Sequence, residues 1–268
     1  MGTDAASRAR LLYVTDVTDD DVYIPSLPTG KLAGKLTGFN QPIGDCVDNS
    51  GDVFITEAQS GDIREFRHGA KQAFNVLADS GYYPLGCSFD PTTGNLAVTN
   101  EIASNGGGNV AVYKRTKGTA TFYSDSNIYQ YGWCAYDDKG NLYVDGSSDP
   151  PSDNPEFAEL PTGKQKFTTI TLNGDLDGYN WLQWDGKYIA VSSGTAEIDE
   201  FAISGSSGTE VGSTPLSGER YVLGFWLESS NGKLTLYAPV LNQESRRATK
   251  TFYAVENPWA ATVSIKAN

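Results

Sequence analysis

The sequence is poor in the residues on which many catalytic and metal sites depend. Its 268 residues include one histidine, one methionine and three cysteines. A single histidine excludes zinc sites that are built from several histidines. That histidine, His68, falls in a predicted turn on the outer part of its repeat, which argues against a Ser-His-Asp or Cys-His catalytic system.

The three cysteines match neither a disulfide framework nor a metal motif. Cys46, Cys87 and Cys134 are 41 and 47 residues apart, and an odd number of cysteines cannot be fully paired. Each of them lies within an apolar strand pattern. We therefore expect three small, buried side chains.

Long apolar runs and basic clusters are also missing. The longest apolar run, "YVLGFWL" at Tyr221–Leu227, is too short to span a bilayer. The N-terminal "MGTDAASRAR" lacks the apolar core of a signal peptide. Twenty basic residues stand against 33 acidic ones, the formal charge is −13, and the one basic stretch, Ser245–Lys250, is short. We therefore expect no nucleic-acid partner and no membrane span.

The residues that are abundant favour strands and turns. The chain has 29 glycines, and tyrosine is the commonest of its aromatic residues. No long stretch carries apolar residues at helical spacing, and alternating or continuous apolar runs of four to seven residues dominate instead. This pattern is typical of an all-β protein.

A segment with one layout recurs along the chain. A short apolar strand ends at an aspartate, a turn containing glycine follows, and a second apolar strand leaves the turn. The aspartate can accept hydrogen bonds from the turn backbone, and the glycine supplies the positive φ. The anchoring aspartates, which lie 42, 47 and 48 residues apart, are Asp48, Asp90, Asp137 and Asp185. The copies are Pro42–Glu57, Pro84–Asn100, Gln130–Gly146, Tyr179–Gly194 and Val222–Pro239, with a half copy at Leu11–Asp16.

Each copy is followed by a third strand and by a more polar fourth strand. Four antiparallel strands every 42–48 residues are typical of a β-propeller blade. The sequence therefore predicts an all-β, six-bladed β-propeller of four-stranded antiparallel blades, with residues 11–268 as one domain after a tail or closing strand at 1–10. The innermost strand of the first blade could come from residues 3–10 or from a different closure at the C-terminus. We assign the final "ATVSIK", Ala261–Lys266, to the outer strand of the last blade.

The repeat resembles the NHL-type repeat. The shared pattern is Pro-x-Gly-x-x-x-Asp-x-x-Gly-Asn-Leu-x-Val, and the likeness extends to the six-bladed gluconolactonase-like and strictosidine synthase-like propellers. More narrowly, "LLYVTD", "GCSFDPTTGNLAVTN" and "KGNLYVDG" resemble uncharacterised NHL-repeat proteins of environmental bacteria that are usually predicted to be exported. The resemblance implies an extracytoplasmic protein (periplasmic, secreted or surface-anchored) whose leader is absent from this sequence. It also implies that ligands bind over the central channel, on the face built from the loops after the second strands and from the connections between blades.

The connections between blades are rich in aromatic side chains. Tyrosine and tryptophan edges beside amide groups suit the face of a sugar or an extended peptide. The alternative is that these rings are wedges that pack between blades. The candidate ligand-binding residues are Tyr82, Tyr83, Tyr129, Tyr131, Tyr179, Trp181, Tyr221 and Asn180.

Polar residues recur where the second strands end. The gluconolactonase-like relatives hold a divalent cation over the channel with carboxylate and amide oxygens, and such oxygens would suit calcium. The candidate metal ligands are Asp16, Glu57, Asn100 and Asp145. The fifth and sixth blades offer only Ser192, Ser193 and Ala238 at the corresponding positions, which weakens the case for a metal.

Two classes of function fit these observations. The first is a non-catalytic binding or scaffold propeller, a monomer without a cofactor, that holds a glycan, peptide or protein partner on its aromatic channel face. The alternative is a Ca²⁺-dependent lactonase or hydrolase with the ion over the central channel. Its chemistry would have to use carboxylates, tyrosine or a carboxylate-bound metal, and the sequence identifies no catalytic residue.

Overall fold

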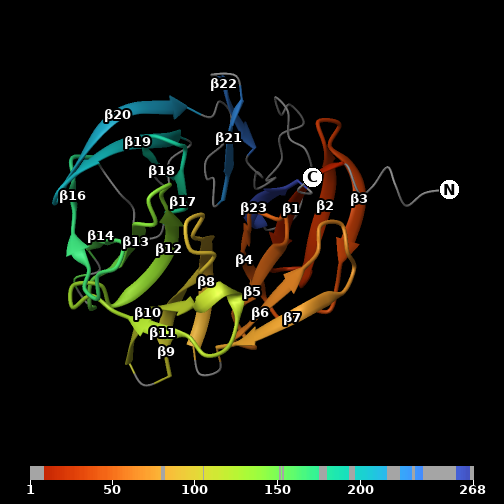
Figure 1. Ribbon diagram of the computed structural model, residues 1–268, viewed down its shortest axis with the longest axis horizontal. Helices are drawn as coiled ribbons and strands as arrows, with labels where there is room; N and C mark the ends of the chain where they lie inside the picture. The colour runs from red at the N-terminus through yellow and green to blue at the C-terminus, as the bar shows by residue number, and fades with distance from the viewer. Residues whose placement is uncertain are drawn as a thin grey trace.

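The chain folds into β-sheets that are arranged as blades around a central axis (Figure 1). In this computed structural model the described residues are 9–79, 82–104, 106–150, 152, 154–174, 180–192, 197–215, 224–230, 233–237 and 258–265. Their helical content is one short 3-10 helix, η1 (Lys114–Thr116). The prediction of an all-β propeller is confirmed.

Five sheets of four or five strands form the blades, and in each of them the strand order runs outward from an inner strand. Blade 1 is β23 (Pro258–Ser264), β1 (Arg10–Asp16), β2 (Asp21–Leu27) and β3 (Lys31–Leu36). Blade 2 is β4 (Pro42–Val47), β5 (Val53–Glu57), β6 (Asp62–Phe66) and β7 (Ala73–Ala78). Blade 3 is β8 (Tyr82–Phe89), β9 (Leu96–Ala103), β10 (Gly106–Tyr113) and β11 (Thr121–Tyr123).

The remaining strands continue the ring. Blade 4 is β12 (Gln130–Tyr136), β13 (Leu142–Ser147), β14 (Pro155–Leu160) and β15 (Thr168–Thr169). Blade 5 is β17 (Leu182–Trp184), β18 (Ile189–Ser192), β19 (Glu197–Ser204), β20 (Ser207–Pro215) and β16 (Thr171–Leu172), which pairs in parallel with β20. A separate two-stranded sheet consists of β21 (Trp226–Ser230) and β22 (Lys233–Tyr237).

The number of blades differs from the prediction. Six four-stranded blades were expected, and the described residues form five. The strands β21 and β22 make the hairpin that the fifth sequence copy predicts, and among the described residues they pair only with each other. The third strand that was expected after them, "TKTFYAV" at residues 249–255, lies outside the described residues.

The ring closes through the C-terminal strand. β23 pairs antiparallel with β1, with Leu12 opposite Val263 and Val14 opposite Ala261, so it is the innermost strand of blade 1. The assignment of Ala261–Lys266 to an outer strand was therefore wrong. The physical reason is that β1 would otherwise present an unpaired inner edge, and β23, whose residues 260–264 are all buried, covers it.

The predicted turns between first and second strands are confirmed. Asp48 Oδ1 accepts the N–H groups of Ser50 and Asp52, both at 2.8 Å. Asp137 Oδ1 accepts those of Lys139 and Asn141 at 2.9 and 2.8 Å. The turn glycines have positive φ, as the pattern required, and they are Gly51, Gly94, Gly140 and Gly186.

One buried side chain on the second strand of each of the five blades bonds an N–H in or next to the inner strand of its own blade, and in blades 1 to 4 it also bonds the next blade. Thr99 on β9 accepts the Gly86 N–H of its own inner strand at 2.9 Å and donates to the Gly132 carbonyl of the next inner strand at 2.6 Å. Thr56 and Thr15 make the same pair of bonds. We call this position the latch, and its residues are Thr15, Thr56, Thr99, Asp145 and Ser192.

In blades 2 and 3 the inner strands of neighbouring blades lie so close beside the latch that a side chain in place of Gly44 or Gly86 would clash. A Cβ on Gly44 would lie 2.0 Å from the carbonyl oxygen of Leu85, and one on Gly86 would lie 2.6 Å from the ring of Trp133. This explains the glycine in the Pro-x-Gly start of these two copies, because a side chain there would push the two blades apart. The equivalent latch donors in blades 1 and 4 are Ala260 and Trp133.

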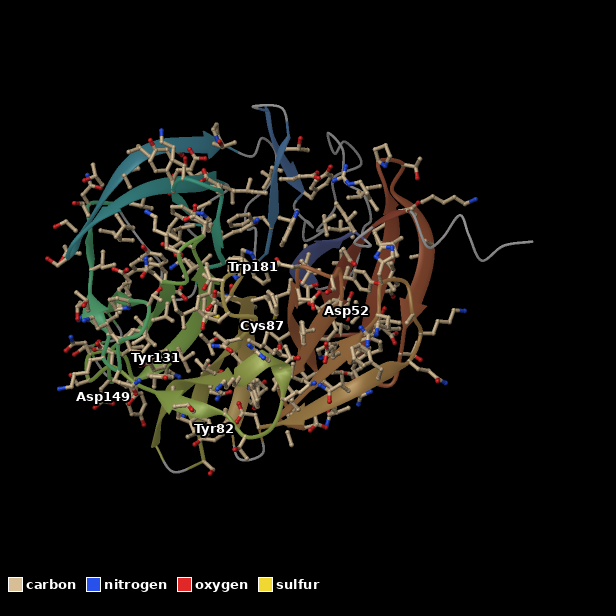
Figure 2. The ribbon with its side chains drawn as sticks, in the orientation of Figure 1. Asp52, Tyr82, Cys87, Tyr131, Asp149 and Trp181 are labelled. Carbon is tan, nitrogen blue, oxygen red and sulfur yellow. A yellow bond between two sulfur atoms is a disulfide. The ribbon has the colours of Figure 1, made fainter. Side chains whose placement is uncertain are left out.

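Two of the cysteines form a disulfide, contrary to the prediction. Cys46 on β4 and Cys87 on β8 are bonded, which links the inner strands of blades 2 and 3, and Figure 2 shows Cys87 near the centre of the ring. Cys134 is free and buried, as expected. The prediction failed because residues 41 positions apart become neighbours only when two repeats pack side by side.

The latch can be tested by removing one hydroxyl. Thr99→Val keeps the shape of the side chain but leaves the Gly86 N–H and the Gly132 carbonyl without their partner, so we expect the free energy of unfolding to fall by about 2 kcal/mol. Urea unfolding measures it. The matched control is Thr121→Val on the outer strand β11, where the side chain is exposed and the change should stay within about 0.5 kcal/mol. Equal losses in both variants would contradict the role of the latch.

The disulfide predicts a simple labelling result. Alkylation of the unfolded, unreduced protein should modify Cys134 alone, and alkylation after reduction should modify all three cysteines. Peptide mass spectrometry gives the count. Modification of Cys46 or Cys87 before reduction would show that the bond is absent.

Candidate functional site

The propeller has two ends with different chemistry. At the loop end the inner strands begin, at Pro42, Tyr82 and Gln130, and the second strands finish. At the turn end the inner strands run into the aspartate turns. The candidate ligand-binding and metal-ligating residues that were predicted from the sequence were expected at the loop end.

Three of the candidate tyrosines are half-buried at the loop end. Tyr83 donates its hydroxyl to Gln41 Oε1 at 2.6 Å, which links blade 3 to the start of blade 2. Tyr129 covers Gly107, where an added Cβ would lie 3.0 Å from the tyrosine ring. Tyr82 stacks on Phe122 of the outer strand β11 at 5.0 Å between ring centroids, and Figure 2 shows it at the outer margin of the ring.

The other candidates are buried or undescribed. Tyr131 is fully buried, and its hydroxyl accepts the Asp125 N–H at 2.5 Å. Trp181 packs against Trp133, with ring centroids 4.4 Å apart, and Asn180 is buried beside it. Tyr179 and Tyr221 lie outside the described residues. Tyr131 and Trp181 thus occupy the wedge positions that the sequence offered as the alternative.

Two of the candidate metal ligands, Asp16 and Glu57, are bound to nearby protein groups. Asp16 Oδ1 accepts the N–H groups of Thr18 and Asp19 in the turn that follows β1. Glu57, fully buried, accepts the Asn40 N–H at 2.7 Å and pairs with Arg64 at 2.6 Å. Burial raises the pKa of Glu57, and the Asn40 N–H and the Arg64 charge oppose that effect.

The other two candidates are also bound to protein groups. Asn100 donates to Asp79 Oδ2 at 2.9 Å and to Asn109 Oδ1 at 3.0 Å. Asp145 accepts the backbone N–H groups of Trp133 at 2.5 Å and Asn180 at 2.6 Å.

Asp145 does not match the other three candidates in position. It corresponds to Thr15, Thr56 and Thr99 rather than to the residues that follow them, and it is the latch of blade 4. The signal was present in the sequence as Val-Thr-Asp, Ile-Thr-Glu, Val-Thr-Asn and Val-Asp-Gly, in which the aspartate takes the place of threonine. Since a strand alternates its faces, this shift by one residue places Asp145 between blades.

The latch position gives Asp145 an unusual acidity. Burial raises its pKa to about 7, although the N–H groups of Trp133 and Asn180 favour the charged form. A threonine latch donates to a carbonyl of the next blade, whereas a carboxylate can only accept, and here the next blade presents the Asn180 N–H instead.

Among the described residues, one group of three acidic side chains could hold a metal ion by geometry: Asp48, Asp52 and Glu65. Each is already bound. Asp48 caps its turn, Asp52 pairs with Arg67 at 2.5 Å, and Glu65 accepts from Asn75 at 2.8 Å. His68 lies between β6 and β7, as predicted, and its Nδ1 is 2.7 Å from the buried Ser264 Oγ. That serine donates to the Gly51 carbonyl, so it is not held as a nucleophile.

A cavity of about 220 Å³ opens at the turn end, which the sequence did not single out. It is lined by the ends of the inner strands and their turns, including Asp45, Cys134, Trp181, Trp184 and Trp226. Asp45 on β4 is 1% exposed, and neither carboxylate oxygen has a hydrogen-bond partner among the described residues. The sequence feature that could have indicated this buried acid is the aspartate inside the apolar inner strand "PIGDCV".

Comparison with solved structures finds the same fold in other proteins. A chain in the crystal structure of a nidogen/laminin complex has a TM-score of 0.70 at 14% identity and covers 96% of this chain and 99% of its own length. A functionally unknown protein from Desulfotomaculum acetoxidans DSM 771 has a TM-score of 0.59 at 10% identity, covering 87% of this chain and 76% of its own. Kuenenia stuttgartiensis hydrazine synthase has a TM-score of 0.56 at 13% identity, covering 71% of this chain and 61% of its own.

At these identities the likenesses show the β-propeller fold and carry no function. No protein-family model matches the sequence, and no curated protein matches it. Within the part of the chain that the structure describes, no helix has the length and apolar character needed to cross a membrane.

The acidity of Asp145 predicts how stability depends on pH. Its folded pKa of about 7 lies above the ordinary value of 3.8, so its contribution is fully present below about pH 4 and is lost as pH rises to about 7. In Asp145→Asn this component should vanish. Between pH 4.5 and 7.5 the stability of the wild type should fall relative to the variant by at least about 1.4 kcal/mol, the equivalent of one pKa unit.

Urea unfolding at the two pH values gives this difference. Asp138→Asn, which changes an exposed acid on the neighbouring turn, is the control and should follow the wild type. Parallel pH profiles for the wild type and Asp145→Asn would contradict the assignment.

Proposed function

We propose that this protein is a non-catalytic binding propeller that holds an extended segment of a partner protein at its loop end. The contact surface consists of Tyr82, Tyr83 and Tyr129, which we call the tyrosine face. The proposal rests on one observation: these three rings are half-exposed where the connections between blades meet, whereas Tyr131 and Trp181 are buried between blades.

The tyrosine face has the properties of a recognition surface. Tyrosine offers a large, rigid contact area with a polar tip, so little conformational entropy is lost when a partner binds. The Tyr83 hydroxyl is already oriented by Gln41, and the ring of Tyr129 is supported by Gly107. A partner would therefore meet rings whose positions are set in advance.

A lactonase or hydrolase has less support. It would need free oxygen ligands over the channel, and Asp16, Glu57, Asn100 and Asp145 are each committed to hydrogen bonds or an ion pair. These bonds also hold turns and blades together, so releasing the oxygens for calcium would cost stability.

The net charge supports a choice of partner, and the disulfide supports a choice of cellular compartment. A formal charge of −13 favours a cationic partner segment. The Cys46–Cys87 disulfide favours an oxidising, extracytoplasmic compartment. The similar nidogen/laminin chain was crystallised in a complex, which makes a protein partner a reasonable choice over a glycan.

We further infer that β21 and β22 belong to a sixth blade, as in the NHL-type propellers that the repeat resembles. They follow blade 5 in the chain, and Trp226 of β21 lines the same central cavity as the inner strands of blades 2 to 5.

The proposal predicts that selected peptides will need the tyrosine face. Peptides selected from a phage-displayed random library on the wild-type protein should be enriched in Lys and Arg. They should bind the Tyr83→Ala/Tyr129→Ala variant at least about tenfold more weakly, a loss of ~1.4 kcal/mol. Fluorescence anisotropy measures the affinities, and circular dichroism checks that the variant folds.

The matched control is Tyr188→Ala, a half-buried tyrosine in the blade 5 turn at the opposite end. It should bind the peptides as the wild type does. Unchanged binding by the double variant would overturn the proposed site, and selection of glycans alone on a parallel array would overturn the choice of partner.

A further inference from the structure

The closing contact of the ring can be located by comparing inner strands. The N–H groups that donate to the threonine latches of blades 1, 2 and 3 belong to Ala260, Gly44 and Gly86. These three residues therefore occupy the same place in β23, β4 and β8. Residues after them can be compared by counting from that place.

The disulfide shows which of the following residues face each other. Cys46 is the second residue after Gly44, and Cys87 is the first after Gly86, and their Cα atoms are 5.7 Å apart. The second residue of one inner strand thus faces the first residue of the next. By the same count Thr262 of β23 faces Asp45 of β4, and β23 and β4 are in contact.

Both members of this pair are buried polar groups for which the described residues provide no hydrogen-bond partner. Asp45 is 1% exposed and Thr262 is 0% exposed. The two carboxylate oxygens of Asp45 and the Thr262 hydroxyl have no hydrogen-bond partner among the described residues. A carboxyl and a hydroxyl complement each other, and a small side-chain rotation would satisfy two groups that are costly to bury unpaired.

Burial favours the neutral form of Asp45, because the interface offers no charge that would compensate an ionised carboxylate. Burial alone raises the pKa of Asp45 well above its ordinary value. β23 carries no titratable residue among those described, and in β8 Cys87 is in the disulfide. The titratable and charged groups on the other packed elements, none of which contributes to the shift, are Arg10, Tyr13 and Asp16 on β1, Glu57 on β5, Tyr82 and Tyr83 on β8, and Cys134, Tyr136, Asp137 and Asp138 around the cavity.

We propose that Asp45 and Thr262 form a clasp that holds the closing strand β23 on blade 2, and that loss of the Asp45 proton loosens it, so the ring is closed more firmly in acid than in base. The cavity at the turn end, which Asp45 lines, lets water approach when the carboxyl ionises. The clasp is at the opposite end from the tyrosine face, so it goes beyond the proposed binding function.

Cross-linking tests the geometry without reference to pH. The double variant Asp45→Cys/Thr262→Cys should form a second disulfide after mild oxidation, because the two positions are equivalent to Cys46 and Cys87. Peptide mapping by mass spectrometry should find positions 45 and 262 joined. In the control, Asp45→Cys/Ala261→Cys, the second site points to the other face of β23 and positions 45 and 261 should stay reduced. No link in the first pair, or equal links in both, would overturn the clasp.

Hydrogen exchange tests whether the clasp depends on the protonation of Asp45. Relative to intrinsic exchange rates, the protection of a peptide that covers residues 258–265 should fall at least about tenfold between pH 5 and pH 9 in the wild type. In Asp45→Asn, which is neutral at every pH and nearly the same shape, protection should be flat. Asp138→Asn should behave as the wild type does.

The sign of the pH dependence follows from the raised pKa of Asp45. The contribution of a neutral Asp45 is fully present at acid pH and is lost as pH rises through its folded pKa. If protection depends on pH to the same extent in the wild type and in Asp45→Asn, the proposal is wrong. Thr262→Val gives an independent check, because it removes the partner without touching the acid. It should lower protection at pH 5 while the pH slope of the wild type remains, because Asp45 is still buried, and unchanged protection at pH 5 would also refute the clasp.

Discussion

The latch is the interaction on which the architecture depends. On the second strand of each of the five blades one buried side chain bonds an N–H in or next to the inner strand of its own blade, and in blades 1 to 4 it also bonds the next blade. Because such a bond bridges two sheets that share no ladder, it sets how far neighbouring blades can separate. The glycines beside the latches of blades 2 and 3, and the tight contact of the inner strands there, follow from that distance.

Variation of the latch has consequences for the rest of the molecule. Threonine serves three blades, while aspartate in blade 4 needs a donor from the next blade and acquires a raised pKa. The disulfide Cys46–Cys87 and the inferred Asp45–Thr262 clasp occupy the same relative place between inner strands. Neighbouring blades are thus joined at equivalent points by different kinds of bond. Of these, only the bonds that involve a carboxyl group depend on pH.

The predictions from sequence succeeded where the chemistry is local. The aspartate turns formed as expected because carboxylate, backbone and glycine lie within a few residues of each other. The predictions failed where a residue's contact partner lies in another repeat. Cys46 and Cys87 were read as unpaired, Asp145 was aligned one residue away from its equivalents, and Ala261–Lys266 was assigned to an outer strand. The half-exposed Tyr83 and the buried Tyr131 look alike in sequence, because exposure depends on which neighbouring blade covers the ring.

The sequence by itself determined the all-β propeller, the period of its repeat and the geometry of its turns, since these depend on residues that are close in the chain. Only the tertiary structure decided how the ring closes, which cysteines pair, which aromatic rings remain open to a partner, and that Asp45 is buried without a local partner. The physical reason is that these features arise between blades, where residues 40 or more positions apart meet and where burial sets both hydrogen bonding and acidity.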